Sequence, residues 1–380
     1  MNKTLRIAIW NANGLAQHAL EVSTFVELHD IDVLLVAETH FTNESYIRLR
    51  DYVLYHTIHP DGKARGGTAI FIKQKIKHYE LQEYKARHLQ ATTINIIGER
   101  GNLVISAVYC PPRYLNSQKQ FEDFFSTLGE RFIVGGDFNA KHTHWGSRLT
   151  TTKGRELFKT AEKHQMSFIS TSSPTYWPSD SNKIPDLLDL FVTRGIGENY
   201  VEVKGCDELS SDHTPVILTI NAIFTRTIRQ PVLTSKKTDW DLFRDKLEEK
   251  INLRIPLINN EQLDEAAEQL TKAIQQAAWD ATPPTTEKDI CKSNYPIEVR
   301  ELVKKKRLAR KRWQETRDPE DKTVANRLSQ QLKRLLHKVK NENINFYLKN
   351  LTNSKESEYS LWKATRKLKR PKFIIPNQEK

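Results

Sequence analysis

Short apolar runs alternate with amphipathic stretches over residues 1–222 of the 380-residue chain. Runs of about four to eight residues that are rich in valine and isoleucine are typical of buried strands. Stretches whose apolar residues recur every three or four positions are typical of helices that lie on a sheet. Many strands with few helices between them indicate sheets that helices cover from outside. We expect strands at 5–10, 32–38, 67–72, 92–98, 102–109, 132–136, 187–192 and 215–220, and helices at 16–29, 117–129 and 152–165.

The pattern changes after about residue 222. Few apolar positions separate the charges there, so we expect thin helices rather than a large core. The charged helical patterns cover 239–252, 260–281, 297–318 and 319–351. This organisation predicts a folded domain at 1–222, a linker at 223–238 and a basic helical segment at 239–380.

Positive charge is concentrated in the second part of the chain. The whole sequence holds 59 Lys and Arg residues against 47 Asp and Glu residues. Residues 1–222 carry 24 basic and 25 acidic side chains, whereas residues 223–380 carry 35 and 22. Such asymmetry is typical of contact with a polyanion, most often nucleic acid. A solvated helical surface, serving only as a connector, is the alternative that stays open.

The apolar runs and the cysteines limit the compartment. No run reaches the ~18–20 apolar residues of a membrane span, and the first apolar stretch is too short for a signal peptide. Cys110, Cys206 and Cys291 are far apart and form neither a disulfide framework nor a metal knuckle. A reducing compartment is the simplest fit, so we expect neither secretion nor a membrane partner.

The stretch GGDFNAKHTHWG, residues 135–146, directly follows an apolar run. Asp137 and Asn139 lie two residues apart, and alternate residues of an extended chain point the same way. An acid and an amide would then face one spot, and the two glycines would let the backbone turn tightly there. A loop held by an Asx-turn explains the same residues equally well.

Polar residues also stand where the other predicted strands end. Each has an ordinary alternative: a turn residue, a cap, a core aromatic or a member of a buried ion pair. An unpaired carboxylate inside an apolar strand would, however, be costly. Their recurrence at strand ends indicates one polar site. The residues are Asn11 and Asn13 after the first strand, Glu38 after the second, Tyr109 after the fifth, Asp189 within the seventh, and Asp212 and His213 before the last.

The order and spacing of these motifs resemble the endonuclease/exonuclease/phosphatase superfamily. The resemblance covers residues 5–221 and implies an α+β fold, a four-layer α/β/β/α sandwich, followed here by a mostly helical basic segment. It departs from the abasic-site enzymes at Asn13, where those enzymes tend to have an acid. The matching motifs are WNANG at 10–14, AETH at 37–40, VYCPP at 108–112, GGDFN at 135–139, LLDLF at 187–191 and SDH at 211–213.

A finer likeness joins the chain to the endonuclease domain of insect non-LTR retrotransposons of the jockey type. It rests on the stretches IAIWNANGL, LLVAETHFT, GGDFNAKHTHWGS, GREL and SSPTYWP. In those elements a reverse transcriptase follows the endonuclease in one polyprotein. This sequence has no YxDD-type polymerase motif, so the resemblance predicts a truncated copy or a fragment without the polymerase.

The resemblance implies a metal-dependent phosphodiester hydrolase. Mg²⁺ prefers oxygen ligands and keeps several waters, so few protein ligands suffice, with Mn²⁺ as a substitute. A general base, a charge stabiliser and its orienting carboxylate complete the chemistry. The implied roles are Glu38, Asn11 and Asp212 for the metal, Asp137 as general base, Asn139 holding water and phosphate, His213 stabilising charge, Asp189 orienting His213, and Tyr109 donating to a phosphate oxygen.

DNA contacts are expected from two further groups and from Asn13. His142 and His144 have the spacing of a zinc pair, but no third ligand is evident. We expect these histidines and Trp145 to line the DNA groove, with packing under the GDFN loop as the alternative. The turn-rich loop 173–186 is expected to lie against DNA through Thr175, Tyr176 and Trp177, with a packed surface loop as the alternative.

The leading expectation is an endonuclease that nicks one strand of target DNA and leaves a 3′-hydroxyl primer for reverse transcription of the element. It would act in the nucleus after cytoplasmic synthesis. The alternatives are a phosphatase, sphingomyelinase or deadenylase on the same fold, and a catalytically decayed or domesticated nucleic-acid-binding remnant. The basic segment would bind DNA or element RNA, and we expect residues 1–222 alone to retain catalysis on short duplexes.

Overall fold

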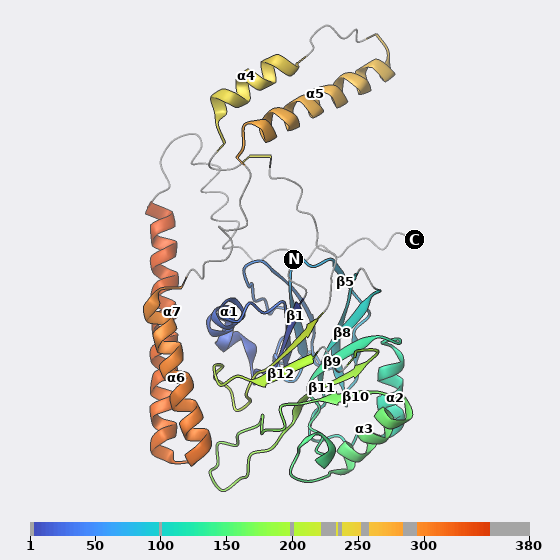
Figure 1. Cartoon of the computed structure of the whole chain (residues 1–380), viewed down its shortest axis with the longest axis vertical. Helices are drawn as coiled ribbons and strands as arrows, with labels where there is room; N and C mark the ends of the chain where they lie inside the picture. The colour runs from blue at the N-terminus through green and yellow to red at the C-terminus, as the bar shows by residue number, and fades with distance from the viewer. Residues whose placement is uncertain are drawn as a thin grey trace. The chain divides into compact units, whose positions relative to one another are not determined.

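The computed structural model describes residues 4–98, 101–197, 201–221, 233–234, 238–251, 258–283 and 295–349. Its described part divides into two compact units, of which the first combines residues 4–221 with residues 295–349 and the second lies within residues 233–283. The first unit contains two mixed β-sheets, and its arrangement can be followed in Figure 1. None of the described helices is long and apolar enough to span a membrane.

The first sheet has the strand order β12-β13-β1-β2-β4-β3. The second has the order β10-β11-β9-β8-β7-β5, and β6 pairs with β7. The first sheet consists of β1 (Thr4–Asn11), β2 (Val33–Ala37), β3 (Tyr52–Thr57), β4 (Thr68–Lys73), β12 (Val201–Gly205) and β13 (Val216–Asn221). The second consists of β5 (His78–Glu80), β6 (Tyr84–Lys85), β7 (Gln90–Ile96), β8 (Leu103–Tyr109), β9 (Phe132–Asp137), β10 (Ser167–Ile169) and β11 (Asp189–Arg194).

Three hydrophobic layers hold the two sheets and their covering helices together. The central layer lies between the sheets, where Ile7 and Leu35 of the first sheet pack with Ile105 and Ile133 of the second. Helix α1 (Ala19–Leu28) covers the outer face of the first sheet. Helices α2 (Gln118–Ser126) and α3 (Thr152–Lys163) cover the outer face of the second. The predicted four-layer sandwich is therefore confirmed.

All eight predicted strands and the three predicted helices of this domain are present, within a few residues of the expected bounds. The first helical stretch begins as a short 3₁₀ helix, η1 (Leu15–His18), and a second one, η2 (Thr143–Trp145), follows the GDFN motif. The strands that were not predicted are β3, β5, β6, β10 and β12. They are short or only partly buried, so they lack the continuous apolar run that marks the others.

The strand directions bring the polar ends of five strands to one edge. β1 and β2 are parallel, with Asn11 opposite Ala37, the residue before Glu38. β8 and β9 are also parallel, with Tyr109 opposite Asp137. β11 runs antiparallel to β9, so its first residue, Asp189, pairs with Asp137.

The two glycines of GGDFN lie inside strand β9, so the prediction that they form a turn is wrong. Both are required by close packing instead. A Cβ on Gly135 would lie 2.6 Å from Ile9 Cγ2 of the facing sheet. A Cβ on Gly136 (φ +152°) would lie 2.0 Å from the carbonyl oxygen of Val108. The glycines therefore let strand β9 approach its neighbours closely enough to deliver Asp137 to the edge.

The remaining helices are shared between the two units. α4 (Trp240–Lys250) and α5 (Asn260–Asp280) form the second unit, where Lys250 Nζ lies 2.6 Å from Asp280 Oδ2. α6 (Ile297–Thr316) and α7 (Pro319–Lys349) belong to the first unit and pack through Val299 and Leu332. Leu20 and Leu28 of α1 pack against that cluster. The sequence predicts one segment at 239–380, whereas the packing distributes the described helices of this segment over two units.

Candidate active site

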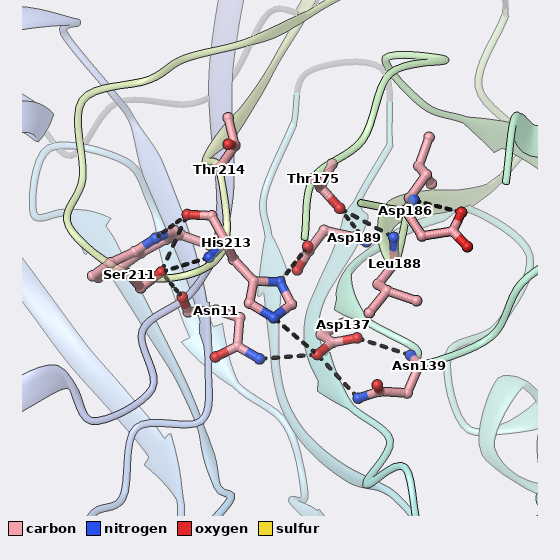
Figure 2. Close-up of polar contacts among 12 residues, drawn as sticks. Asn11, Asp137, Asn139, Thr175, Asp186, Leu188, Asp189, Ser211, His213 and Thr214 are labelled. Atoms are coloured by element: carbon pink, nitrogen blue, oxygen red, sulfur yellow. Dashed lines mark hydrogen bonds and ion pairs between the residues drawn. The ribbon is translucent and has the colours of Figure 1, made fainter. Parts of the chain in front are cut away.

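Polar side chains from both sheets meet at the edge where β1, β2 and β9 end. Asn11 Nδ2 donates to Glu38 Oε1 at 3.0 Å and to Asp137 Oδ2 at 2.9 Å. Asn139 Nδ2 donates to the same Asp137 oxygen at 3.0 Å, and the Asn139 backbone N–H donates to Oδ1 at 2.8 Å (Figure 2). The bond from the Asn139 backbone N–H to the Asp137 carboxylate is of the Asx-turn type. The same carboxylate also accepts from Asn11 and Asn139 in the site. The amide of Asn11 links the ends of the two sheets.

The imidazole of His213 lies between two buried carboxylates. His213 Nδ1 is 2.6 Å from Asp189 Oδ2, and His213 Nε2 is 4.0 Å from Asp137 Oδ2 (Figure 2). Ser211 Oγ donates to the carbonyl oxygen of Asn11 at 2.7 Å and accepts from the His213 backbone N–H at 3.1 Å. The structure thus joins the SDH motif to the end of β1 and aims the imidazole at Asp137.

Uncommon backbone conformations gather at this edge. Asn13, Glu38 and Asn139 have φ values of 44°, 50° and 47°, in the left-handed region that non-glycine residues seldom adopt. Glu38 is the most unusual of the three, because asparagine tolerates this region better than glutamate does. Residues held in such conformations cluster at functional sites, where the surrounding structure enforces them. Their coincidence with the hydrogen-bonded carboxylates marks the same edge.

Burial and neighbouring charge move the Asp137 and His213 pKa values upward. Burial of Asp137 and the carboxylate of Asp189 raise the pKa of Asp137, although the His213 cation opposes them. Burial alone would lower the pKa of His213, but the carboxylates of Asp189, Asp137 and Asp212 outweigh it and raise that pKa. Asp137 is thus a stronger base than a free carboxylate, and His213 favours its cationic form.

Glu38 and Tyr109 are held in opposite charge states. Burial would raise the pKa of Glu38, but hydrogen bonds with His40, Asn11 and Tyr109 lower it. Burial and the charges of Glu38 and Asp137 raise the pKa of Tyr109, so its hydroxyl keeps its proton and can donate. The site therefore holds an ionised carboxylate beside a neutral hydroxyl donor.

The donor set at this edge fits Mg²⁺, which binds carboxylate and amide oxygens. Asp212 Oδ1 is buried, and no described residue gives it a hydrogen-bond partner. Asn11 Oδ1 accepts the Asn13 backbone N–H at 3.0 Å, which leaves it a second lone pair. Glu38 supplies an ionised carboxylate, because its hydrogen bonds lower its pKa. Glu38, Asn11 and Asp212 thus offer oxygen atoms that could hold such an ion.

The structure places the predicted DNA-contacting residues unequally. Asn13 is exposed beside the site, and the Tyr176 ring centroid lies 5.0 Å from that of His213. Trp145 is only 3% exposed and packs against Phe168, so its predicted contact with DNA is wrong. Its burial agrees with the alternative of packing under the GDFN loop.

Thr175 also requires a correction. Its side chain is buried, and its Oγ1 accepts the backbone N–H groups of Leu188 at 3.1 Å and Asp189 at 3.0 Å (Figure 2). A hydroxyl in this position fixes the start of β11 and cannot reach a bound strand. The TSSPTYWP stretch therefore supports the site through the buried Thr175, which holds the backbone at Asp189.

His142, His144 and Trp177 have protein partners of their own. The His142 ring stacks on Phe158 with centroids 4.4 Å apart. The His144 side chain is exposed, yet its ring centroid lies 4.9 Å from that of Phe158. The Trp177 ring lies 6.4 Å from Trp313 of α6. Contact of these three residues with DNA stays a prediction.

Two supporting residues from α6 were missed by the sequence analysis. Arg310 donates to backbone carbonyls of the SDH loop, and the side-chain amide of Gln314 lies 3.1 Å from Thr214 Oγ1. Arg310 is one of eight basic residues in α6, and nothing in the local pattern separates it from the others. The apolar residues Val299, Val303 and Trp313 are the only sign in the sequence of the helix face that the structure buries.

Comparison with known proteins places the chain among nucleases and phosphatases. The model of the endonuclease/exonuclease/phosphatase family matches residues 8–213, which include the strand-end residues from Asn11 to His213 but not Arg310 and Gln314 of α6. The chain belongs to the endonuclease/exonuclease/phosphatase family. The strand-end site lies within the matched region.

Several relatives of this family member are mobile-element proteins of Drosophila melanogaster. The chain is 32% identical over 375 residues to the "Probable RNA-directed DNA polymerase from transposon BS", covering 97% of this chain and 41% of the relative. It is 31% identical over 379 residues to the "RNA-directed DNA polymerase from mobile element jockey", covering 98% of this chain and 41% of the relative. The chain thus spans about 41% of the length of these relatives.

A similar solved structure is the endonuclease domain of TRAS1, a telomere-specific non-LTR retrotransposon. It has 16% sequence identity and a TM-score of 0.49, and the match covers 58% of this chain and 99% of that domain.

Proposed function

We propose that this chain is a Mg²⁺-dependent DNA endonuclease that nicks one strand of its target. The observation that carries the proposal is the His213–Asp189 pair, set against Asp137 at the joined ends of the two sheets. One acid with a raised pKa, one buried cation and an ionised Glu38 suit the hydrolysis of a phosphodiester.

The positions of the side chains support the following reaction. Asp137 takes a proton from a water held by Asn139, and the water oxygen forms a bond to phosphorus. The bond from phosphorus to the 3′-oxygen breaks, and that oxygen takes a proton from a solvent water to become a hydroxyl. The His213 cation stabilises the negative charge that builds up on the phosphate, in the orientation that Asp189 fixes. Tyr109 donates to a phosphate oxygen.

Mg²⁺ bound by Glu38, Asn11 and Asp212 would supply positive charge to the phosphate and to the leaving oxygen. The relatives are named as RNA-directed DNA polymerases of mobile elements. A nick with a 3′-hydroxyl could serve such a polymerase as a primer, so we propose target-primed reverse transcription as the role of the nick. Action in the nucleus, and contact of the basic helices with element RNA, remain predictions.

Supercoiled plasmid provides the test of metal-dependent nicking. With Mg²⁺ or Mn²⁺ we expect conversion to nicked circles, and with EDTA we expect none. Asp137→Asn is the control for contaminating nuclease, because it removes the base and keeps an acceptor for Asn11 and Asn139. Full activity in EDTA would overturn the metal dependence. Cleavage of phosphoinositide, sphingomyelin or poly(A) without nicking would favour the other enzymes of this fold.

A further inference from the structure

Arg310 of helix α6 is buried on the backbone of the loop that carries Asp212 and His213. It is 6% exposed. Nη1 donates to the carbonyl oxygen of Leu209, and Nη2 donates to those of Ser211 at 2.7 Å and His213 at 3.2 Å. The planar fork of a guanidinium suits several acceptors at once, which an ammonium cannot match. One side chain thus fixes three carbonyls within residues 209–213.

Two neighbours on the same face of α6 extend this contact. Lys306 is 1% exposed, donates to the carbonyl oxygen of Glu208 at 2.5 Å and pairs with the carboxylate of Glu21. Gln314 meets Thr214 at the other end of the loop. Lys306, Arg310 and Gln314 are spaced four residues apart, so they share one helix face. In sequence order they meet residues 208, 209–213 and 214, and we call these three side chains the α6 face.

The loop that carries Trp177 is held by Arg317, which follows α6, and by Lys322 of α7. Arg317 Nη2 donates to the carbonyl oxygen of Pro178 at 2.8 Å, and Lys322 Nζ donates to that of Ser179 at 2.8 Å. The Arg317 guanidinium lies 5.2 Å from the centroid of the Trp313 ring. The backbone N–H of Trp177 in turn donates to the Asp212 carbonyl at 2.7 Å. The two loops are therefore fastened to each other and to α6.

The fixed loop determines where the His213 imidazole lies. The His213 carbonyl accepts from Arg310 and also from Trp10 Nε1, at 3.2 Å each, so the backbone of His213 is held between α6 and strand β1. Loops that lack such bonds open readily. A displacement of about 1 Å at a catalytic group can lower a rate about 100-fold.

We propose that Arg310 is a positioning residue for the nuclease reaction, acting through the loop 209–213 to set His213 against Asp189 and Asp137. This rests on the function proposed above. Residues 1–222 would then be an incomplete nuclease, in contrast to the sequence-based expectation that they retain catalysis. Part of the basic charge of the later segment would accordingly serve the active site rather than a polyanion.

The test compares variants of the full chain in nicking of a duplex oligonucleotide with Mg²⁺. Arg310→Met removes the donors and the charge, whereas Arg310→Lys keeps the charge and loses the fork. Lys305→Met is the matched control, because Lys305 is an exposed cation of the same helix. We expect kcat to fall about 10- to 100-fold in Arg310→Met, and less in Arg310→Lys, with KM for DNA within about threefold of the parent. Lys305→Met should keep the parental kcat.

Hydrogen–deuterium exchange of the amides in 207–216 gives a readout that needs no activity. We expect faster exchange in both Arg310 variants and parental exchange in Lys305→Met. An inactive parent would overturn the proposed nuclease function and leave the exchange data to decide on positioning. Parental exchange and parental kcat in Arg310→Met would overturn the positioning role. A second pattern would also overturn the positioning role. If Lys305→Met lost as much activity as Arg310→Met while Arg310→Lys lost none, the positive charge alone would account for the effect.

If Arg310→Met does not unfold cooperatively, and so lacks a native fold, Gln314→Leu tests the positioning role of the α6 face instead. This variant removes a neutral amide from the same face and leaves Arg310 in place. We expect kcat to fall about threefold to tenfold with faster exchange near Thr214. Parental kcat together with parental exchange would contradict the role of the α6 face.

Discussion

Helices α5 and α6 have 21 and 20 residues and both are highly charged, yet they are placed very differently. α5 carries five acidic side chains and one basic side chain, and the residues that it buries are three alanines. α6 carries three acidic and eight basic side chains, and it buries Lys306 and Arg310. Buried cations are tolerated only when acceptors satisfy them. α6 can bury its two cations because the backbone carbonyls of the loop 208–213 accept their hydrogen bonds.

This contrast separates two groups of basic residues in the later segment. Lys306 and Arg310 of the α6 face donate to loop carbonyls, so they are not free to meet phosphate. Exposed cations such as Lys304 and Lys311 remain on the surface. Net charge alone could not separate these groups. The variants below test the separation, from the largest expected effect to the smallest.

Substitutions at Asp137 and His213 should lower the nicking rate more than substitutions in α6 do. Asp137→Asn and His213→Gln should each lower the single-turnover nicking rate by about 10²–10⁴, because they remove the base or the charge stabiliser. The rate should be measured at saturating DNA, with thermal unfolding as the control for folding. An Arg310→Met variant more damaged than both would show that Arg310 does more than position His213. A parental rate in either site variant would remove that residue from the reaction.

A matched pair of leucines tests whether α6 and α7 are part of the nuclease fold. Leu332 of α7 is 2% exposed and packs with Val299, whereas Leu263 of α5 is 53% exposed. Leu332→Ala should lower the free energy of unfolding of the first unit by about 2–5 kcal/mol through the cavity it leaves. Leu263→Ala should change it by less than about 0.5 kcal/mol. Denaturant unfolding, followed by exchange of the β1 and β9 amides, measures both. Equal effects would contradict the contrast between the two helices.

The α6 and α7 cations should also give the first unit a pH dependence through His18. Burial, followed by the charges of Lys306, Lys333 and Arg310, lowers the pKa of His18 to about 4, although the Glu21 carboxylate lies 3.5 Å from its Nδ1. Below pH about 6.5, His18 binds a proton in the unfolded chain, whereas in the folded chain it stays neutral until the pH falls to about 4. The free energy of unfolding should therefore decrease, by about 1–2 kcal/mol, as the pH falls from about 6.5 to 4.

His18→Gln should remove this part of the pH dependence. Unfolding of the parent and of the variant should be measured at matched pH values across the same interval. An unchanged profile in the variant would mean that other groups produce the loss of stability.

Exposed cations of α6 should act on affinity rather than rate. Lys304→Ala with Lys311→Ala should flatten the dependence of log binding constant on log salt by about 0.7–0.9 for each phosphate that the two lysines neutralise in the parent. Lys272→Ala, which removes the single basic residue of α5, is the control and should leave the slope unchanged. An unchanged slope in the α6 double variant would mark these cations as a solvated surface.

The sequence predicted the strand-end site because local patterns determine it. Apolar runs locate β1, β2, β8 and β9, and the polar residue after each run must lie at the edge where parallel strands end. Asn11, Glu38 and Asp137 meet there for that reason. The in-strand glycines could not be predicted locally, since Gly135 is required by Ile9 of the facing sheet.

The α6 face could not be predicted because its partners lie about 100 residues away in sequence. Arg310 is separated from Ser211 by 99 residues, and no periodicity connects them. The same limit explains Trp145 and Thr175. The local sequence does not show whether such a side chain is exposed or buried. Trp145 is buried because it packs against Phe168, and Thr175 is buried because its hydroxyl binds the start of β11.

Sealing of the nick by a DNA ligase tests the proposed hydrolysis most directly. The chemistry assigned to Asp137 and His213 leaves a 5′-phosphate beside a 3′-hydroxyl, which are the ends that a ligase joins. Plasmid nicked with Mg²⁺ and then freed of the protein should return to covalently closed circles on treatment with ligase and ATP. Nicks that the ligase cannot close, but that close once the 3′-phosphate has been removed and a kinase has added a 5′-phosphate, would contradict the proposed direction of cleavage.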